Sequence, residues 1–287
     1  MVERLGIKKI FAKGTLACVA LFGLTLSSND PESFPYPTNT PIVAMGDSFA
    51  AGTGAGDYLT GTDTQDNRCR RSEHAPVAQI ATEFGLSNVT NIACRGASPS
   101  DIFIGQYNEP NQLQSLSPNT EVVVLSIGGN LINLNDLLRD CEQSCEADSE
   151  VVRSATEKLQ SDEFRQELQD VYQAILEKAP KATLYTTLYP KPIVERPLCP
   201  TLISKDTDRF IDDFIDRLNE AIIGAISQLD SPRAILVPAP AGIDACASFF
   251  TGVTITGADP GHPTPSSAEK IGNYIVGVMW RQQEKAS

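Results

Sequence analysis

This sequence has few histidines and few basic residues, and it lacks the cysteine spacing that is typical of zinc sites. The 287 residues include two histidines and no Cys-x-x-Cys pair, so a structural zinc site is not expected. Lys and Arg total 23 against 36 Asp and Glu, which gives a formal net charge of −13 at pH 7. Nucleic acid is therefore a poor partner, because its binding depends on basic side chains that neutralise phosphates. Nucleotide loops are also missing, since Gly52, Gly54 and Gly56 lack the G-x-G-x-x-G spacing and no G-K-[ST] sequence occurs.

Long apolar runs are limited to one segment near the N-terminus. It covers residues 14–26, which is shorter than the roughly 20 residues that cross a bilayer. Four basic residues precede it and two serines follow it: Arg4, Lys8, Lys9, Lys13, Ser27 and Ser28. This layout predicts a secretory signal peptide over residues 1–28, cleaved near Ser28. We therefore expect a secreted protein without a stable membrane anchor. Loss of the segment removes four bases and one acid, which changes the net charge to −16.

The cysteine count becomes even once the predicted signal peptide is removed. Seven cysteines occur in the chain, and Cys18 lies in the apolar run. The other six are Cys69, Cys94, Cys141, Cys145, Cys199 and Cys246. An even number in an oxidising compartment predicts three disulfides. Because six cysteines can pair in fifteen ways, their spacing alone leaves the connectivity open.

The rest of the chain alternates between strand and helix patterns. A proline-rich leader over 29–40 comes first. Short apolar runs then predict strands over 41–46, 88–94, 121–127, 182–188 and 234–238. Helical spacing of apolar residues predicts helices over 75–84, 150–179, 206–229 and 266–280. This alternation predicts a single α/β domain over 41–287, with a mainly parallel five-stranded sheet covered by helices on both faces.

Three of the predicted strands end in residues suited to acyl chemistry. Ser48 follows the first strand, Gly96 the second and Asn130 the third. Because the carboxyl ends of parallel strands meet at one edge of a sheet, we expect these residues to lie close together. The N–H groups of Ser48 and Gly96 and the Asn130 amide are donors that could surround an oxyanion. Each residue by itself also has an ordinary explanation, as a helix cap or a turn glycine.

The sequence Asp259-Pro-Gly-His262 precedes the last predicted helix and supplies a candidate base. A serine hydroxyl is a weak nucleophile and needs a base of near-neutral pKa, which is the usual role of histidine. A carboxylate three residues earlier can hold the imidazole in one tautomer. The second histidine, His74, lies in a polar stretch at the start of a predicted helix. His262 is therefore the expected base.

Together these motifs resemble the four blocks of the SGNH hydrolases, also called GDSL esterases and lipases. The residues that carry the resemblance are Gly46-Asp47-Ser48, Gly96, Gly129-Asn130 and Asp259-x-x-His262, and their order matches over roughly residues 40–280. The resemblance implies a three-layer α/β/α fold with Ser48 as nucleophile, His262 as base and Asp259 orienting the base. It also implies an oxyanion hole made by the N–H groups of Ser48 and Gly96 and by the Asn130 side chain. Asp47 is expected to hold the turn without taking part in the chemistry. One departure is Leu131, which stands where the family usually has Asp.

The cysteine distribution, with Cys69 followed by Arg-Arg-Ser, further resembles the secreted, disulfide-bonded lipases and esterases of actinomycetes. This resemblance implies the bridges Cys69–Cys94, Cys141–Cys145 and Cys199–Cys246. The first bridge would tie the loop after the nucleophile to the Gly96 loop.

We therefore expect a secreted serine esterase or lipase that acts as a monomer on a small-molecule or lipid ester. No metal or organic cofactor is expected. A polysaccharide acetylesterase is the alternative within the same fold, and a non-catalytic secreted binding protein is the alternative from another class. Acyl-chain length depends on the pocket walls, expected over 99–118, 131–149 and 191–205. Leu131, Ile132 and Leu134 could form an apolar acyl slot, although the first turn of a buried helix is the interpretation we favour.

Overall fold

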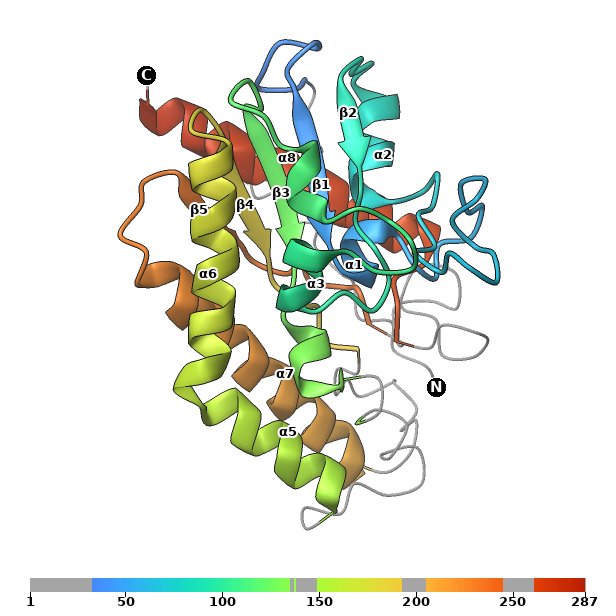
Figure 1. Cartoon of the computed structure of the whole chain (residues 1–287), viewed down its shortest axis with the longest axis vertical. Coiled ribbons are helices and arrows are strands. Elements are labelled where there is room, and N and C mark those ends of the chain that lie inside the picture. The colour runs from blue at the N-terminus through green and yellow to red at the C-terminus, as the bar shows by residue number, and fades with distance from the viewer. Residues whose placement is uncertain (1–32, 135–136, 138–148, 193–204, 245–260, 287) are drawn as a thin grey trace, which may run out of the picture.

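The five predicted strands form one parallel sheet. The computed structural model describes residues 33–134, 137, 149–192, 205–244 and 261–286. Within these residues the strand order is β2-β1-β3-β4-β5, the order of flavodoxin-like folds (Figure 1). Every pair of neighbouring strands is parallel, so the sheet is wholly and not only mainly parallel. The strands are β1 (Ile42–Gly46), β2 (Val89–Asn91), β3 (Val122–Ser126), β4 (Thr183–Thr187) and β5 (Ala234–Val237).

The helices of the described residues connect these strands. The long ones are α2 (Pro76–Glu83), α5 (Glu150–Gln160), α6 (Asp162–Lys178), α7 (Lys205–Ser227) and α8 (Pro265–Ala286). Four shorter helical segments follow strand ends or lie in loops: α1 (Ser48–Ala51), α3 (Pro99–Ile104) and the 3₁₀ helices η1 (Gln112–Ser115) and η2 (Gly129–Ile132). The periodicity did not predict these four, because each is too short to show a repeat of 3.6 residues.

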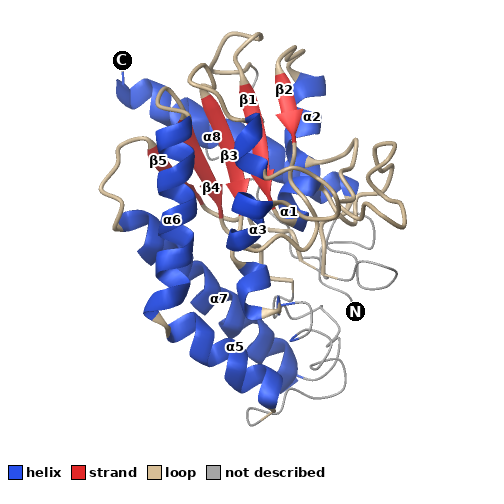
Figure 2. Ribbon diagram, viewed as in Figure 1, coloured by secondary structure: helices blue, strands red, loops and turns tan. Residues whose placement is uncertain are grey.

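Alternate residues of the central strands point to opposite faces of the sheet, where they enter two separate cores. Val43 and Met45 of β1 pack in the core that includes residues of α3, α5, α6 and α7. Ile42 and Ala44 pack on the opposite face with residues of α2 and α8. Figure 2 shows the strands lying between these two helical layers. The expected three-layer α/β/α sandwich is therefore confirmed.

The segment 150–179, which was expected to be one helix, is two helices divided at Ser161. Ser161 has an extended backbone (φ −74°, ψ 148°), and its Oγ accepts a hydrogen bond from the Phe164 N–H at 3.1 Å. The same hydroxyl donates to the carbonyl of Lys158 at 2.7 Å. Ser161 thus ends α5 and caps α6, a role that serine performs well. The prediction of a single helix was wrong because apolar spacing continues across the break.

The proline-rich leader packs on the domain from Ser33 onward. Phe34 and Tyr36 lie against the core formed with α2 and α8. The Tyr36 hydroxyl is 2.8 Å from the hydroxyl of Tyr185 on β4, and the Trp280 indole N–H donates to the Ser33 carbonyl at 2.8 Å. These contacts hold the start of the described chain next to its C-terminal helix. None of the helices in the described part of the chain has the length and apolarity needed to cross a bilayer.

Candidate active site

The turn after β1 presents Ser48 at the carboxyl edge of the sheet. Gly46 has a φ of +111°, and a Cβ at this position would lie 1.9 Å from the Ser126 carbonyl oxygen, so only glycine allows this approach to β3. Asp47 then caps α1, because its Oδ1 accepts a hydrogen bond from the Phe49 N–H at 3.0 Å. The helix cap is therefore Asp47, and Ser48 is the first residue of the helix. The N–H of a first helical residue has no acceptor within the helix, which leaves it able to bind a ligand.

Ser48 and His262 meet although 214 positions separate them in the chain. The His262 Nε2 lies 2.8 Å from the Ser48 Oγ. Both residues are buried, with 5% of Ser48 and 4% of His262 exposed. His262 lies in the segment that leads into α8. An imidazole in this position can accept the hydroxyl proton while the serine oxygen attacks a carbonyl carbon.

Two neighbours confine the His262 imidazole. A Cβ at Gly54, whose φ is +90°, would lie 2.7 Å from the Cβ of His262, so the loop after α1 approaches the histidine at a distance that excludes a side chain. The Phe49 ring packs against the imidazole with 5.4 Å between ring centroids. Packing on these neighbours therefore helps to direct Nε2 toward Ser48.

The two other predicted donors lie beside the nucleophile turn. Gly96 is in the turn after β2 with a φ of +81°, and Asn130 is in η2 after β3. The Asn130 Nδ2 donates to the Ala97 carbonyl at 2.9 Å. An amide nitrogen carries two protons, so one remains for a further acceptor. The Cys94 N–H donates to the Gly46 carbonyl at 2.9 Å, which places the β2 turn next to the β1 turn. The structure therefore brings the three predicted donors to one edge of the sheet.

A buried glutamine supports the nucleophile turn and was not predicted from the sequence. The Gln112 side chain, 4% exposed, accepts a hydrogen bond from the Gly46 N–H at 2.6 Å and donates one to the Gly46 carbonyl at 2.9 Å. It thereby satisfies both backbone groups of the last residue of β1. Gln112 begins the short helix η1, and no sequence pattern distinguishes it from a surface glutamine.

Asp47 also takes part in a second buried contact, with Tyr189. The Tyr189 hydroxyl donates to Asp47 Oδ2 and accepts a hydrogen bond from the Gly129 N–H at 2.9 Å. Burial raises the pKa of Asp47 from 3.8 to about 6, although the bonds from Tyr189 and the Phe49 N–H act in the opposite direction. Burial, followed by the charge of Asp47, raises the pKa of Tyr189 well above its ordinary value of 10. Above about pH 6, the pair therefore consists of a carboxylate and a neutral phenol that donates to it.

Covalent and ionic contacts join the loops around the site. Cys69 and Cys94 form a disulfide, which links the loop after α1 to the residues preceding Gly96. Arg71 of the first loop pairs with Glu109 of the loop after α3 at 2.5 Å. Burial opposes ionisation of Glu109, but the Arg71 and Asn67 hydrogen bonds outweigh it and lower the pKa of this carboxyl. These contacts therefore favour the ionised form of Glu109.

The comparisons with known proteins agree with this geometry. A family model described as the GDSL-like Lipase/Acylhydrolase family matches residues 44–266, a range that includes Ser48, Gly96, Asn130 and His262. The chain belongs to this family. The expected membership of the SGNH hydrolases is confirmed. The chain is therefore classed as a carboxylic ester hydrolase.

Three similar proteins come from Streptomyces. Lipase 1 of Streptomyces coelicolor is 35% identical over 154 residues, 52% of either chain, so the match spans about half the length of that relative. A lipase of Streptomyces rimosus is 26% identical over 258 residues, which cover 88% of this chain and 90% of that one. The crystal structure of phospholipase A1 from Streptomyces albidoflavus NA297 superposes with a TM-score of 0.70 at 26% identity, covering 85% of this chain and 99% of that one.

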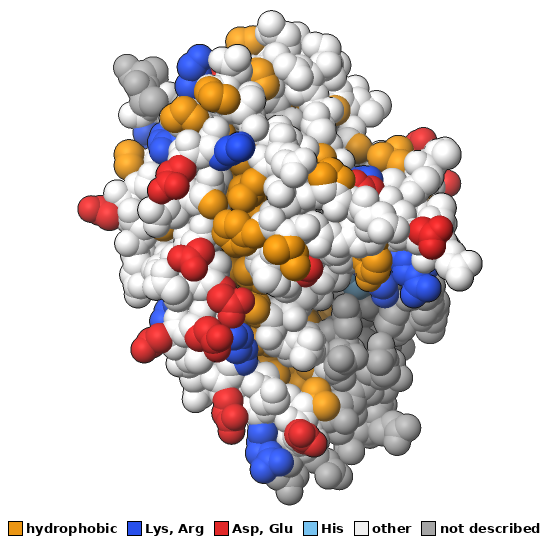
Figure 3. All heavy atoms as spheres, in the orientation of Figure 1, with side chains coloured by type: hydrophobic (Ala, Val, Ile, Leu, Met, Phe, Trp, Pro, Cys, Tyr) orange, Lys and Arg blue, Asp and Glu red, His pale blue; other side chains and the backbone are white. Residues whose placement is uncertain are grey.

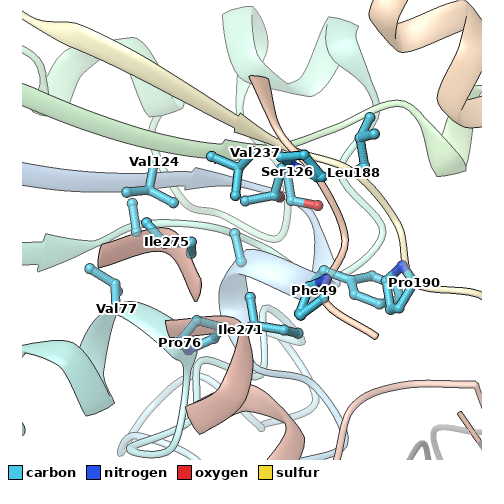
Figure 4. A pocket seen from close by; sticks show the side chains of 15 residues that line it. Phe49, Pro76, Val77, Val124, Ser126, Leu188, Pro190, Val237, Ile271 and Ile275 are labelled. Atoms are coloured by element: carbon cyan, nitrogen blue, oxygen red, sulfur yellow. The ribbon is translucent and has the colours of Figure 1, made fainter. Parts of the chain in front are cut away.

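A narrow apolar pocket lies behind the nucleophile turn of this GDSL-like hydrolase. Phe49 lines it together with Leu188 and Pro190, which follow β4, and with Ile271 and Ile275 of α8 (Figure 4). Its cavity volume is about 30 Å³, well below the roughly 300–1,000 Å³ of typical small-molecule pockets.

A larger groove begins immediately after Asn130. Leu131 and Ile132 line it together with residues of α5, and its volume is about 350 Å³. Ile132 and Leu134 are nevertheless buried in the core, 2% and 9% exposed, whereas Leu131 is half-buried. The core interpretation therefore holds for Ile132 and Leu134, and Leu131 is the more exposed of the two residues of this group that line the groove.

Several predicted features lie outside the described residues. They are the signal peptide 1–28, Asp259, and the cysteines expected to pair as Cys141–Cys145 and Cys199–Cys246. The second histidine, His74, is at the surface, where its Nε2 lies 2.8 Å from Asp57. Within the described ranges, no three His, Cys, Asp or Glu side chains are grouped so that they could hold a metal ion.

Proposed function

We propose that this chain is a secreted serine esterase or lipase that hydrolyses carboxylic esters through an acyl-enzyme on Ser48. The observation that carries the proposal is the 2.8 Å contact between the Ser48 Oγ and the His262 Nε2 in a buried setting. Serine and histidine from distant parts of the chain, placed beside backbone and amide donors, form the arrangement needed for acyl transfer.

In the proposed mechanism, the Ser48 oxygen attacks the ester carbonyl while His262 takes the hydroxyl proton. The N–H groups of Ser48 and Gly96 and the second proton of the Asn130 amide stabilise the oxyanion. His262 then donates the proton to the leaving alcohol, and the acyl group stays on Ser48. In the second half-reaction, His262 activates a water molecule that releases the acid. Asp259 is proposed to hold the imidazole in the required tautomer. No cofactor takes part in either step.

Exposed apolar side chains near Gly96 support an ester with an apolar part. Phe103 and Ile104 end α3, and Tyr107 follows in the same loop; they are 39%, 75% and 37% exposed. The Tyr107 hydroxyl lies 3.9 Å from the position that a Cβ of Gly96 would occupy, so this apolar segment borders the proposed oxyanion hole. On the face drawn in Figure 3, acidic and basic side chains of the described residues lie among each other. We therefore favour a lipid or a small apolar ester over an acetylated polysaccharide as the substrate.

A serine-reactive fluorophosphonate tests the enzyme proposal directly. The wild-type protein should be labelled, and the S48A variant should be neither labelled nor active. The control is S227A, which changes an exposed serine of α7 that bonds only within its own helix and should be labelled as the wild type is. Absence of wild-type labelling would favour a non-catalytic binding protein, and labelling of S48A would exclude Ser48 as the nucleophile.

Two further measurements separate the remaining alternatives. A series of esters from acetate to long acyl chains, together with acetylated xylan, distinguishes a lipase or esterase from a polysaccharide acetylesterase. N-terminal sequencing of protein from the culture medium tests secretion, and a mature chain that begins near Asn29 is the expected result.

A further inference from the structure

Tyr189 connects two of the loops on which the proposed mechanism depends. It lies two residues after the end of β4, and 2% of it is exposed. Its hydroxyl donates to the Asp47 carboxylate and accepts a hydrogen bond from the Gly129 N–H. Asp47 immediately precedes Ser48, and Gly129 immediately precedes Asn130. One side chain from the segment after β4 therefore bonds to the neighbour of the nucleophile and to the neighbour of the amide donor.

The Tyr189 ring also contacts Phe49, the residue that packs against the imidazole of the proposed base His262. Phe49 meets the Tyr189 ring edge to face, with 5.0 Å between centroids and an interplanar angle of 87°. Phe49 also packs against the His262 imidazole, with 5.4 Å between ring centroids. Edge-to-face contacts between aromatic rings are favourable and directional. A shift of Tyr189 would therefore be transmitted to His262 through Phe49.

Tyr189 is itself held in place from two directions. The Asn219 side chain of α7 accepts a hydrogen bond from the Tyr189 N–H at 3.0 Å and donates one to the Tyr189 carbonyl at 2.9 Å. The Tyr189 ring also packs closely on the loop that contains Gly129, because a Cβ at Gly129 would lie 3.3 Å from the ring. The position of the phenol is thus determined by α7 and by close packing, so it can serve as a fixed reference for the loops that it bonds.

We propose that Tyr189 is a positioning residue that sets the distance between Ser48, the Asn130 amide and His262. The inference rests on the proposed function of these three residues. An oxyanion hole made from two different loops stabilises a transition state only when its donors keep their relative positions to a fraction of an ångström. Tyr189 does not touch the substrate in this scheme, and it acts through Asp47, Gly129 and Phe49.

The decisive variant is Y189F, which removes the hydroxyl and keeps the ring. The matched control is Y172F on α6, because Tyr172 is fully buried in the same core and its hydroxyl has no hydrogen-bond partner among the described residues. Activity is normalised to the number of sites that a fluorophosphonate labels, so that only folded, reactive enzyme is counted. We expect the kcat of Y189F to fall on the order of tenfold to a hundredfold, with KM changed less than about threefold. Y172F should keep the wild-type kcat. An unchanged kcat in Y189F would overturn the proposal, as would an equal loss in Y172F.

The D47N variant tests whether the effect travels through the Asp47 contact. An asparagine side chain can replace only one of the two bonds that the Asp47 carboxylate accepts, because its nitrogen donates where an oxygen accepted. We expect D47N to lower kcat in the same way, and the D47N/Y189F double variant to be no slower than the slower single variant. Losses that multiply in the double variant would mean that the two residues act independently, which contradicts the proposal.

A folding defect in Y189F does not leave the question open. In that case the N219A variant carries the test, since it leaves the Tyr189 side chain intact and releases only its backbone. The proposal expects a lower kcat per labelled site with unchanged KM, and a wild-type kcat would refute it. Failure of the proposed function is recognised separately, because either the wild type would be unlabelled and inactive or S48A would retain activity. If S48A is inactive while Y189F retains the wild-type kcat, only the role of Tyr189 is refuted.

Discussion

Replacement of Gly54 by alanine should move His262 without removing any polar group of the site. The Cβ of alanine would lie 2.7 Å from the His262 Cβ and 3.2 Å from the Pro263 carbonyl oxygen. Carbon atoms pack at about 3.5 Å, so the histidine has to move by about 0.8 Å. If His262 moves by that amount directly away from Ser48, the distance between its Nε2 and the Ser48 Oγ increases from 2.8 Å to about 3.6 Å. This is beyond the range of a hydrogen bond. We expect kcat to fall on the order of tenfold to a hundredfold.

Gly56 provides the matched control in the same loop. Gly54 and Gly56 have φ values of +90° and +73°, so alanine is strained by its backbone at either position, at a cost of roughly 1–2 kcal/mol. A Cβ at Gly56, however, meets no heavy atom within 4 Å. G54A and G56A should therefore lose similar amounts of stability from the backbone, while only G54A displaces the base.

The comparison needs the kcat of both variants, the rate of fluorophosphonate labelling and the free energy of unfolding. G54A should be labelled slowly and turn over slowly, and G56A should behave as the wild type in both assays below its unfolding temperature. If G54A and G56A have the same kcat, the close approach of this loop to His262 does not position the base. The steric explanation would then be refuted.

Two further predictions concern stability. The C69A/C94A double variant should lose about 3.5 kcal/mol in urea unfolding, because the bridge closes a loop with a sequence separation of 25 and constrains the unfolded chain; a loss below about 1 kcal/mol would contradict this estimate. For Asp47, the folded-state pKa of about 6 exceeds the ordinary value of 3.8, so the folded protein holds this proton more tightly than the unfolded chain. The resulting stabilisation is largest below about pH 3.8 and is lost as the pH rises through 6, so the free energy of unfolding of the wild type relative to D47N should decline by about 2 kcal/mol between pH 4 and pH 7. A difference between the two proteins that is constant with pH would show that Asp47 does not titrate in this way.

Local patterns predicted most of the regular structure because they record burial directly. The five apolar runs correspond to β1 to β5 within a few residues, since a strand buried on both faces must be apolar along its whole length. The helices α2, α7 and α8 were also visible in the apolar spacing. The break at Ser161 was missed because a helix boundary depends on a cap, and apolar residues on either side of a cap keep the same spacing.

The order of residues along the strands also predicted much of the candidate site. In a parallel sheet, the residues after successive strands reach one edge, which is why Ser48, Gly96 and Asn130 could be placed together from the sequence. His262 could be chosen as the base because the chain contains only two histidines. The family resemblance assigned roles to these residues, and the 2.8 Å contact between Ser48 and His262 is consistent with the roles of these two.

Tertiary structure decided how these residues are supported. Gln112 bonds to the backbone of Gly46, which lies 66 positions away in the sequence. Tyr189 bonds to the side chain of Asp47, which lies 142 positions away. Nothing in the local sequence of a glutamine or a tyrosine shows that its polar atom will be buried, because burial depends on what folds over it. The sequence by itself therefore determined the layers, the strand ends and the chemical groups. Only the fold determined which distant side chains satisfy the buried polar groups, since most such groups have a partner and that partner is selected by packing in three dimensions.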